Sequence, residues 1–320
     1  MNAGSGHLVT TDARTRHSDD DSTKEWVMRR KPPVQSGAVL SLCLALAGCT
    51  GSPTDGGKEP PAHVLNIRDI NALTLPLDAY SPTRAQRRSI QVAKKALMTR
   101  CLEGLGLKAD LPNPRNTPFQ PNTRRYGIAE EARAGTFGYS APEISKRPRQ
   151  PGLSPEVERA VFGKGSPTVR GKKIPDGGCE GKADQMLGAG IPDPKPDLTA
   201  VGRLGVATLE RSARDSRVRA VFAKWSACMK RSGFNYSTPV DANSDRAFID
   251  SRTHDVTKRE TATALADVRC KKETNLINVW AGVETAYQKI AIAQNKPVLT
   301  SVRKVLDTRI RNAAKASDQP

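Results

Sequence analysis

Cysteine offers the widest choice of chemistry in this chain, which contains six cysteines. A cysteine thiol can bind zinc, form a disulfide or carry a lipid. Structural zinc sites usually bring their cysteines or histidines in close pairs, about two to five residues apart. Among Cys101, Cys179, Cys228 and Cys270, the nearest two are 42 positions apart. This spacing argues against a metal site.

Few residues are suited to acid–base or nucleophilic catalysis. After residue 48 the only histidines are His63 and His254, which leaves little for general acid–base work. The chain has no G-x-S-x-G or H-E-x-x-H motif, and these are the patterns that position a nucleophile or a catalytic zinc. The sequence therefore predicts a protein that is not an enzyme and that has neither a catalytic residue nor a cofactor.

Carboxylates are the remaining candidates for chemistry. Glu130 with Glu131, or Glu156 with Glu158, are residues of the type that flanks a glycosidic bond in a hydrolase. The aromatic residues that would line a sugar or peptide groove are Trp225, Trp280, Tyr126 and Tyr139. Both tryptophans fall on apolar helical stripes, which favours a place in the core. A cell-wall hydrolase is therefore the weakest of the functions that we consider.

A segment near the start of the chain has the layout of an export signal. Arg29-Arg30-Lys31 precedes an apolar run of 11 residues, from Gly37 to Ala47, whereas a membrane-spanning helix needs about 20. A basic region, a short apolar core and small residues are typical of a secretory signal peptide. The run ends in Leu46-Ala47-Gly48-Cys49.

Leu46-Ala47-Gly48-Cys49 resembles the lipobox of bacterial lipoproteins. The resemblance implies that the sulfur of Cys49 receives a diacylglycerol and that signal peptidase II cleaves before it, so that residues 28–48 are the signal peptide. It also implies an extracytoplasmic protein, held by lipid on the outer face of the cell membrane. The overall composition, rich in alanine and arginine, resembles the secreted lipoproteins of actinomycetes.

The regions on either side of the signal peptide differ from it in composition. Residues 1–27 include Asp19-Asp20-Asp21. Positive residues before a signal peptide keep that end in the cytoplasm, and acidic residues at the same place oppose this orientation in the membrane. We expect translation to begin at or just before Met28, with residues 1–27 a mis-called extension; the alternative is an unusually long basic region. Residues 49–64 are rich in glycine, proline and polar residues, which predicts a flexible tether.

Export implies that the remaining cysteines form disulfides. Cys43 leaves with the signal peptide and Cys49 carries lipid, so four cysteines remain, and an even number in an exported protein indicates two bridges. Four cysteines allow three connectivities. The simplest pairs Cys101 with Cys179 and Cys228 with Cys270.

Two of the cysteines stand in similar surroundings. The stretches from Cys101 to Leu107 and from Cys228 to Phe234 share a cysteine, an apolar residue, three variable positions, a glycine and another apolar residue. Both predict the last turn of a helix ended by a glycine cap. Each is followed by a cysteine at the start of, or within, another helix. This pattern suggests a weak duplication of a helix, cysteine, loop, cysteine, helix unit.

Apolar periodicity predicts a mainly α fold. A stripe through Trp280, Val283 and Tyr287 indicates one long helix from about Val256 to Gln294, and Pro297 ends or kinks it before a final helix. Ser81-Pro82 and Ser154-Pro155 predict helix starts with a serine cap and a proline in the first turn. The chain divides into a loop-rich helical half, 65–200, and a half with longer helices, 201–320.

The charge indicates an anionic partner. The whole chain has a formal net charge of +18. Residues 1–48 contribute six basic and five acidic residues, so the mature chain stays strongly basic. In the cytoplasm such a charge would suit nucleic acid, but after export the abundant anions are lipid headgroups and cell-wall polymers.

We therefore expect a non-enzymatic envelope protein that binds a cell-wall polymer or a membrane-complex protein, with no nucleic-acid partner. The alternative is a solute-binding lipoprotein serving a transporter, which would need two α/β lobes.

The intact mass of the protein extracted from its host membranes tests the anchor. We expect a mass that begins at acylated Cys49, with four thiols that react with an alkylating agent only after reduction. A mass that retains residues before Cys49, or four thiols that react without reduction, would contradict export.

Overall fold

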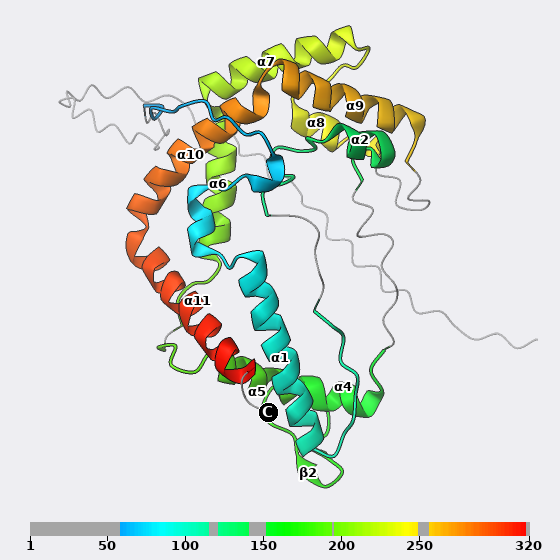
Figure 1. Ribbon diagram of the computed structural model, residues 1–320, viewed down its shortest axis with the longest axis vertical. Helices are drawn as coiled ribbons and strands as arrows, with labels where there is room; N and C mark the ends of the chain where they lie inside the picture. The colour runs from blue at the N-terminus through cyan, green and yellow to red at the C-terminus, as the bar shows by residue number, and fades with distance from the viewer. Residues whose placement is uncertain (1–57, 115–120, 141–151, 194, 249–255, 318–320) are drawn as a thin grey trace, which may run out of the picture. The chain divides into compact units, whose positions relative to one another are not determined.

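The computed structural model describes residues 58–114, 121–140, 152–193, 195–248 and 256–317. All of these residues lie in one compact unit, Gly57–Pro320. The two halves expected over 65–200 and 201–320 therefore belong to a single folded body, in which helix α1 (Arg84–Gly104) packs against helix α11 (Lys296–Ser317) (Figure 1).

The described chain is mainly α-helical, as the periodicity predicts. Besides α1 and α11, its α-helices are α2 (Glu131–Phe137), α4 (Pro155–Phe162), α5 (Gly178–Leu187), α6 (Ala200–Arg214), α7 (Ser216–Arg231), α8 (Pro239–Asn243), α9 (Lys258–Glu273) and α10 (Leu276–Gln294). Three short 3-10 helices are η1 (Ile70–Ala72), η2 (Pro76–Tyr80) and η3 (Arg246–Phe248). The only strands in the described residues, β1 (Thr168–Val169) and β2 (Lys172–Lys173), form an antiparallel pair.

Helix starts follow the expected capping chemistry at one of two sites. Ser154 caps α4 by accepting a hydrogen bond from the Val157 amide, and Pro155 occupies the first turn, which confirms that prediction. The cap expected at Ser81 is wrong, because Thr83 caps α1 instead. The Thr83 hydroxyl and the Gln86 side chain each accept a hydrogen bond from the other's backbone, a reciprocal arrangement that favours the later start.

Both expected glycine caps are confirmed and have the same geometry. Gly106 and Gly233 follow α1 and α7 with φ of +81° and +86°, a conformation that glycine adopts without steric cost. The Leu107 amide donates to the Leu102 carbonyl and the Phe234 amide donates to the Met229 carbonyl, both at 2.9 Å. These bonds satisfy carbonyls that the helix end leaves unpaired.

The single helix expected from Val256 to Gln294 is wrong. The chain breaks between α9 and α10 at Asn275, which adopts a left-handed conformation with φ of 57°. Asparagine tolerates this conformation better than most residues. Apolar periodicity alone does not reveal the break, because both helices turn apolar side chains to the same core. The expected separate final helix is present: α10 ends at Gln294 and α11 begins at Lys296, with Pro297 in its first turn.

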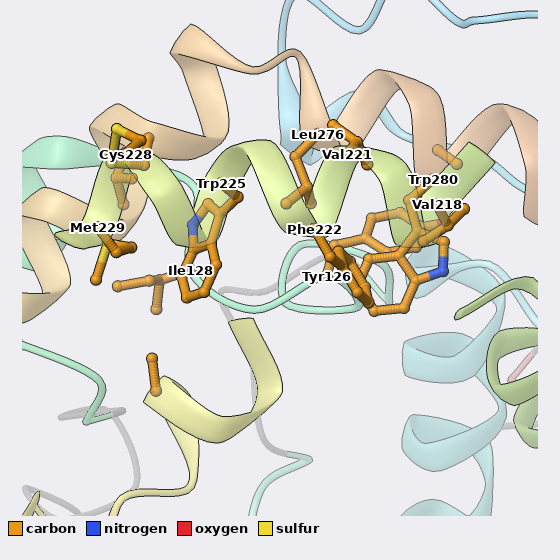
Figure 2. Packing of buried hydrophobic residues seen from close by; sticks show 14 of the residues in the cluster. Tyr126, Ile128, Val218, Val221, Phe222, Trp225, Cys228, Met229, Leu276 and Trp280 are labelled. Atoms are coloured by element: carbon orange, nitrogen blue, oxygen red, sulfur yellow. A yellow bond between two sulfur atoms is a disulfide. The ribbon is translucent and has the colours of Figure 1, made fainter. Parts of the chain in front are cut away.

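The largest core lies where α7, α9 and α10 meet (Figure 2). Trp225 is 0% exposed and Trp280 is 3% exposed, which confirms their predicted place in the core. Trp280 packs against Tyr126 and edge-on against Phe222, with ring centroids 5.0 and 4.9 Å apart. Aromatic rings in these tilted arrangements contribute attraction beyond the apolar area they bury.

The segment before η1 is part of this folded body. The Glu59 carboxylate accepts hydrogen bonds from the amide and hydroxyl of Ser216, and Arg217 donates to the Pro60 carbonyl. A side chain at Gly282 of α10 would place its Cβ 2.0 Å from the His63 carbonyl oxygen, so glycine permits the close crossing. The folded body therefore begins within the tether expected over 49–64.

The two disulfides have the predicted connectivity. Cys101 of α1 is bonded to Cys179 of α5, and Cys228 of α7 is bonded to Cys270 of α9, with Cα atoms 5.5 and 5.6 Å apart. The Cys228–Cys270 bridge lies in the large core and the Cys101–Cys179 bridge lies in a second, smaller one. Each disulfide therefore joins two helices beside a different core.

Removal of either disulfide should destabilise the fold. We expect Cys101→Ala with Cys179→Ala, and separately Cys228→Ala with Cys270→Ala, to lower the free energy of unfolding by about 2–4 kcal/mol each, since the unfolded chain loses a constraint. The first pair closes a loop of 78 residues and the second a loop of 42, so the first loss should be larger by roughly 0.5 kcal/mol. Urea denaturation measures both, with the fully reduced protein as the lower limit. Unchanged stability would contradict the assignment.

Candidate functional site

Most of the carboxylates singled out from the sequence bind other side chains of the folded body. Glu131 binds Lys272 with 2.7 Å between the charged atoms, and Glu156 binds Arg170 at 3.1 Å. Their partners' hydrogen bonds lower the pKa of each carboxyl. Glu130 accepts a hydrogen bond from Asn71. Three of the four carboxylates considered from the sequence thus have polar partners of their own in the described structure.

Tyr126 and Tyr139 do not line a groove, contrary to the alternative considered from the sequence. They are 2% and 8% exposed, respectively, and belong to the large core. The lipobox residues, Leu46 to Cys49, and His254 lie outside the described residues.

A buried carboxylate, Glu284 of α10, is the centre of the most extensive polar cluster. Its side chain is 0% exposed. Arg125 donates to it through Nε, 2.9 Å from both carboxylate oxygens, and through Nη2. The Tyr126 hydroxyl donates at 2.8 Å and the Gln288 amide at 2.8 Å. These hydrogen bonds offset the cost of taking the carboxylate out of water.

The Glu284 cluster joins segments that are distant in the sequence. Arg125 Nη2 also donates to the Gly205 carbonyl on α6, at 2.7 Å. The side-chain oxygen of Gln288, Oε1, accepts a hydrogen bond from the backbone amide of Leu77 in η2, at 3.0 Å. Burial acts to lower the pKa of Arg125, but the hydrogen bonds to Glu284 outweigh it, so that the pKa is raised overall. Burial, together with the Glu284 charge, raises the pKa of Tyr126 well above its usual value.

A second buried ion pair joins Lys271 and Asp267 on α9. Their charged atoms are 2.9 Å apart, and both side chains are at most 1% exposed. Lys271 also donates to the Ile128 carbonyl, and Trp225 donates to Asp267. Burial raises the pKa of Asp267, although the Lys271 charge acts in the other direction. Every charged atom of this pair has a partner inside the core, which indicates a structural role.

A pocket of about 550 Å³ lies beside the Glu284 cluster. Ligand sites in proteins are typically roughly 300–1,000 Å³ in volume. We call it the α6–α11 pocket; its walls come from η2, α1, α6, α10 and α11, with Arg125 and Gln288 in its lining. Among the described residues, no group of three or more histidines, cysteines or carboxylates is arranged to hold a metal ion. Its volume makes the pocket a candidate for binding a small organic ligand.

No protein-family model, curated protein or solved structure matches this chain. The described helices also include none that is long and apolar enough to cross a membrane.

The sequence contained a sign that Glu284 is a buried, paired carboxylate, but the apolar residues around it on the helix obscured this sign. Glu284 stands next to Val283 and between Trp280 and Tyr287, where a carboxylate on a core-facing helix must be paired. Gln288, four positions later, lies on the same helical face. Nothing in the sequence identifies Arg125 as the partner, since 159 positions separate it from Glu284.

Substitution of Glu284 should be far more costly than substitution of an exposed carboxylate. We expect Glu284→Gln to lower the free energy of unfolding by about 3–5 kcal/mol, because it leaves the guanidinium of Arg125 in the interior without its counter-charge. Glu131→Gln removes the same charge from an exposed ion pair and is the control, for which we expect an unchanged denaturation midpoint. Chemical denaturation of both variants is the measurement. Equal midpoints would show that the buried pair does not support the fold.

Proposed function

We propose that this protein is a lipid-anchored, extracytoplasmic and non-enzymatic binding protein of the bacterial cell envelope. In this proposal, the lipid on Cys49 holds the protein at the outer face of the cell membrane. The exposed cations of α1 and α11 bind an anionic polymer of the cell wall.

The disulfides support the extracytoplasmic location. Disulfides persist in oxidising compartments and are rare in the cytoplasm. The described structure pairs all four cysteines that follow the lipobox. This pairing agrees with the export that Leu46-Ala47-Gly48-Cys49 implies.

The packing of α1 against α11 is the observation that favours an anionic polymer as the ligand. α1 contains six lysines and arginines and one acidic residue, and α11 contains six and one. The sequence separates these helices by almost two hundred residues, but the fold packs them side by side (Figure 1). Eight cations of the pair are exposed: Arg84, Arg87, Arg88, Lys296, Arg303, Lys304, Arg311 and Lys315. Concentrated positive charge attracts a polyanion, and salt screens the attraction.

Charge removal from the two helices tests polymer binding. We expect Arg84→Gln, Lys304→Gln and Lys315→Gln together to reduce co-sedimentation with purified cell wall several-fold at low salt, because the polymer loses three cationic contacts. High salt should abolish the binding of the unaltered protein.

The matched control removes the same charge from α7, through Arg219→Gln, Lys224→Gln and Lys230→Gln, three cations that are also exposed. We expect this control to retain most of its binding. Equal losses for both triple variants would show that net charge, and not the α1–α11 pair, is responsible. Absence of binding at low salt would exclude the polymer as the ligand.

A further inference from the structure

The walls of the α6–α11 pocket are largely apolar. Val201 and Val206 of α6 face this space together with Val302, Val305 and Leu306 of α11. At its mouth, Val206 is 59% exposed and Leu198 is 48% exposed. Exposed aliphatic side chains that adjoin an apolar hollow mark a place where an apolar molecule gains contact area.

The charged groups of the lining favour an anion. The lining contains three arginines, Arg87, Arg125 and Arg309, and one carboxylate, Asp78. Arg125 is paired with Glu284. Arg309 is paired with Asp184 through Nη2, while its buried Nε has no hydrogen-bond partner.

Arg87 is the cation in the pocket lining that has no carboxylate partner among the described residues. Its guanidinium donates to the Pro82 carbonyl at 3.3 Å, and no carboxylate of the described residues lies within salt-bridge distance of it. The lone carboxylate of the lining is already engaged. Asp78 Oδ2 accepts hydrogen bonds from the Leu75 amide and the Asn122 side chain, at 2.8 and 2.6 Å. Arg87 therefore offers unused donors to a carboxylate or phosphate.

Two glycines of α6 keep the pocket open. Gly202 and Gly205 are three positions apart in the helix, and both line the pocket. A Cβ at Gly202 would meet nothing within 4 Å, and one at Gly205 would meet only the Arg125 guanidinium, at 3.9 Å. Glycine weakens a helix relative to alanine, and no packing contact requires it at these two positions. The absence of side chains here leaves space beside Arg125.

We propose that the α6–α11 pocket binds an anionic amphiphile, a molecule with a long alkyl chain and a carboxylate or phosphate head. The alkyl chain lies between the aliphatic side chains of α6 and α11, and the head accepts hydrogen bonds from Arg87. This inference goes beyond polymer binding and does not depend on it.

Calorimetric titration with single-chain amphiphiles tests the proposal. The protein is the mature chain from residue 49 with Cys49→Ser, exported so that both disulfides form, and the probes are laurate, dodecyl phosphate and 1-dodecanol below their aggregation concentrations. We expect either anion to bind at least about tenfold more tightly than dodecanol, since a charged hydrogen bond contributes that much or more. Tighter binding of laurate indicates a free carboxylic acid as the natural ligand, and tighter binding of dodecyl phosphate indicates a lipid phosphate.

Two variants with matched controls locate the binding. Gly205→Leu fills the pocket and should weaken laurate binding by about tenfold or more, whereas Gly104→Leu should not, because Gly104 also has open space around it but lies outside the pocket at the end of α1. Thermal melting verifies that both variants fold.

Arg87→Gln should weaken laurate but not dodecanol, and Arg84→Gln, which removes an exposed cation one turn earlier, should change neither. Equal binding of laurate and dodecanol, no binding of either anion, or full affinity in folded Gly205→Leu would each overturn the proposal.

Discussion

The burial of one carboxylate, Glu284, constrains much of the arrangement around it. A charge in the interior is tolerated only when hydrogen-bond donors surround it. The donors come from Arg125 and Tyr126, in the segment before α2, and from Gln288 on α10 itself. Arg125 and Gln288 in turn bind the backbone of α6 and η2. A single charged group therefore links four segments, and all four contribute residues to the lining of the α6–α11 pocket.

The two disulfides act on different parts of the same body. The Cys228–Cys270 bridge lies within the large aromatic core. The Cys101–Cys179 bridge joins α1 to α5 and lies in the second, smaller core. α1 also packs against α11, so the bridge to α5 helps to hold the basic pair of helices in place. The Cys101–Cys179 disulfide and the proposed presentation of charge to the cell wall thus depend on the same helix.

The proposed polymer site and the proposed amphiphile site use different properties of α1 and α11. Exposed lysines and arginines on these helices supply long-range attraction that salt screens. The aliphatic residues Val302, Val305 and Leu306 on α11, each at most 8% exposed, supply short-range contact inside the pocket. A protein held at the membrane surface would meet both kinds of anion, polymeric and lipidic, on the same side of the bilayer.

The sequence by itself determined the helical class, the glycine caps after α1 and α7 and the core position of both tryptophans, and it offered the observed disulfide connectivity as the simplest of three. These features follow from local rules: apolar residues recur with the helical period, glycine adopts positive φ at helix ends, and cysteines beside similar helix ends suggest their own pairing. The break at Asn275 was missed because the apolar period continues across it.

Only the tertiary structure decided which distant groups meet. It placed Arg125 against Glu284, packed α1 against α11 and left open space beside Gly205. Periodicity reports which face of a helix is buried, but the partner of a buried charge depends on how the whole chain packs.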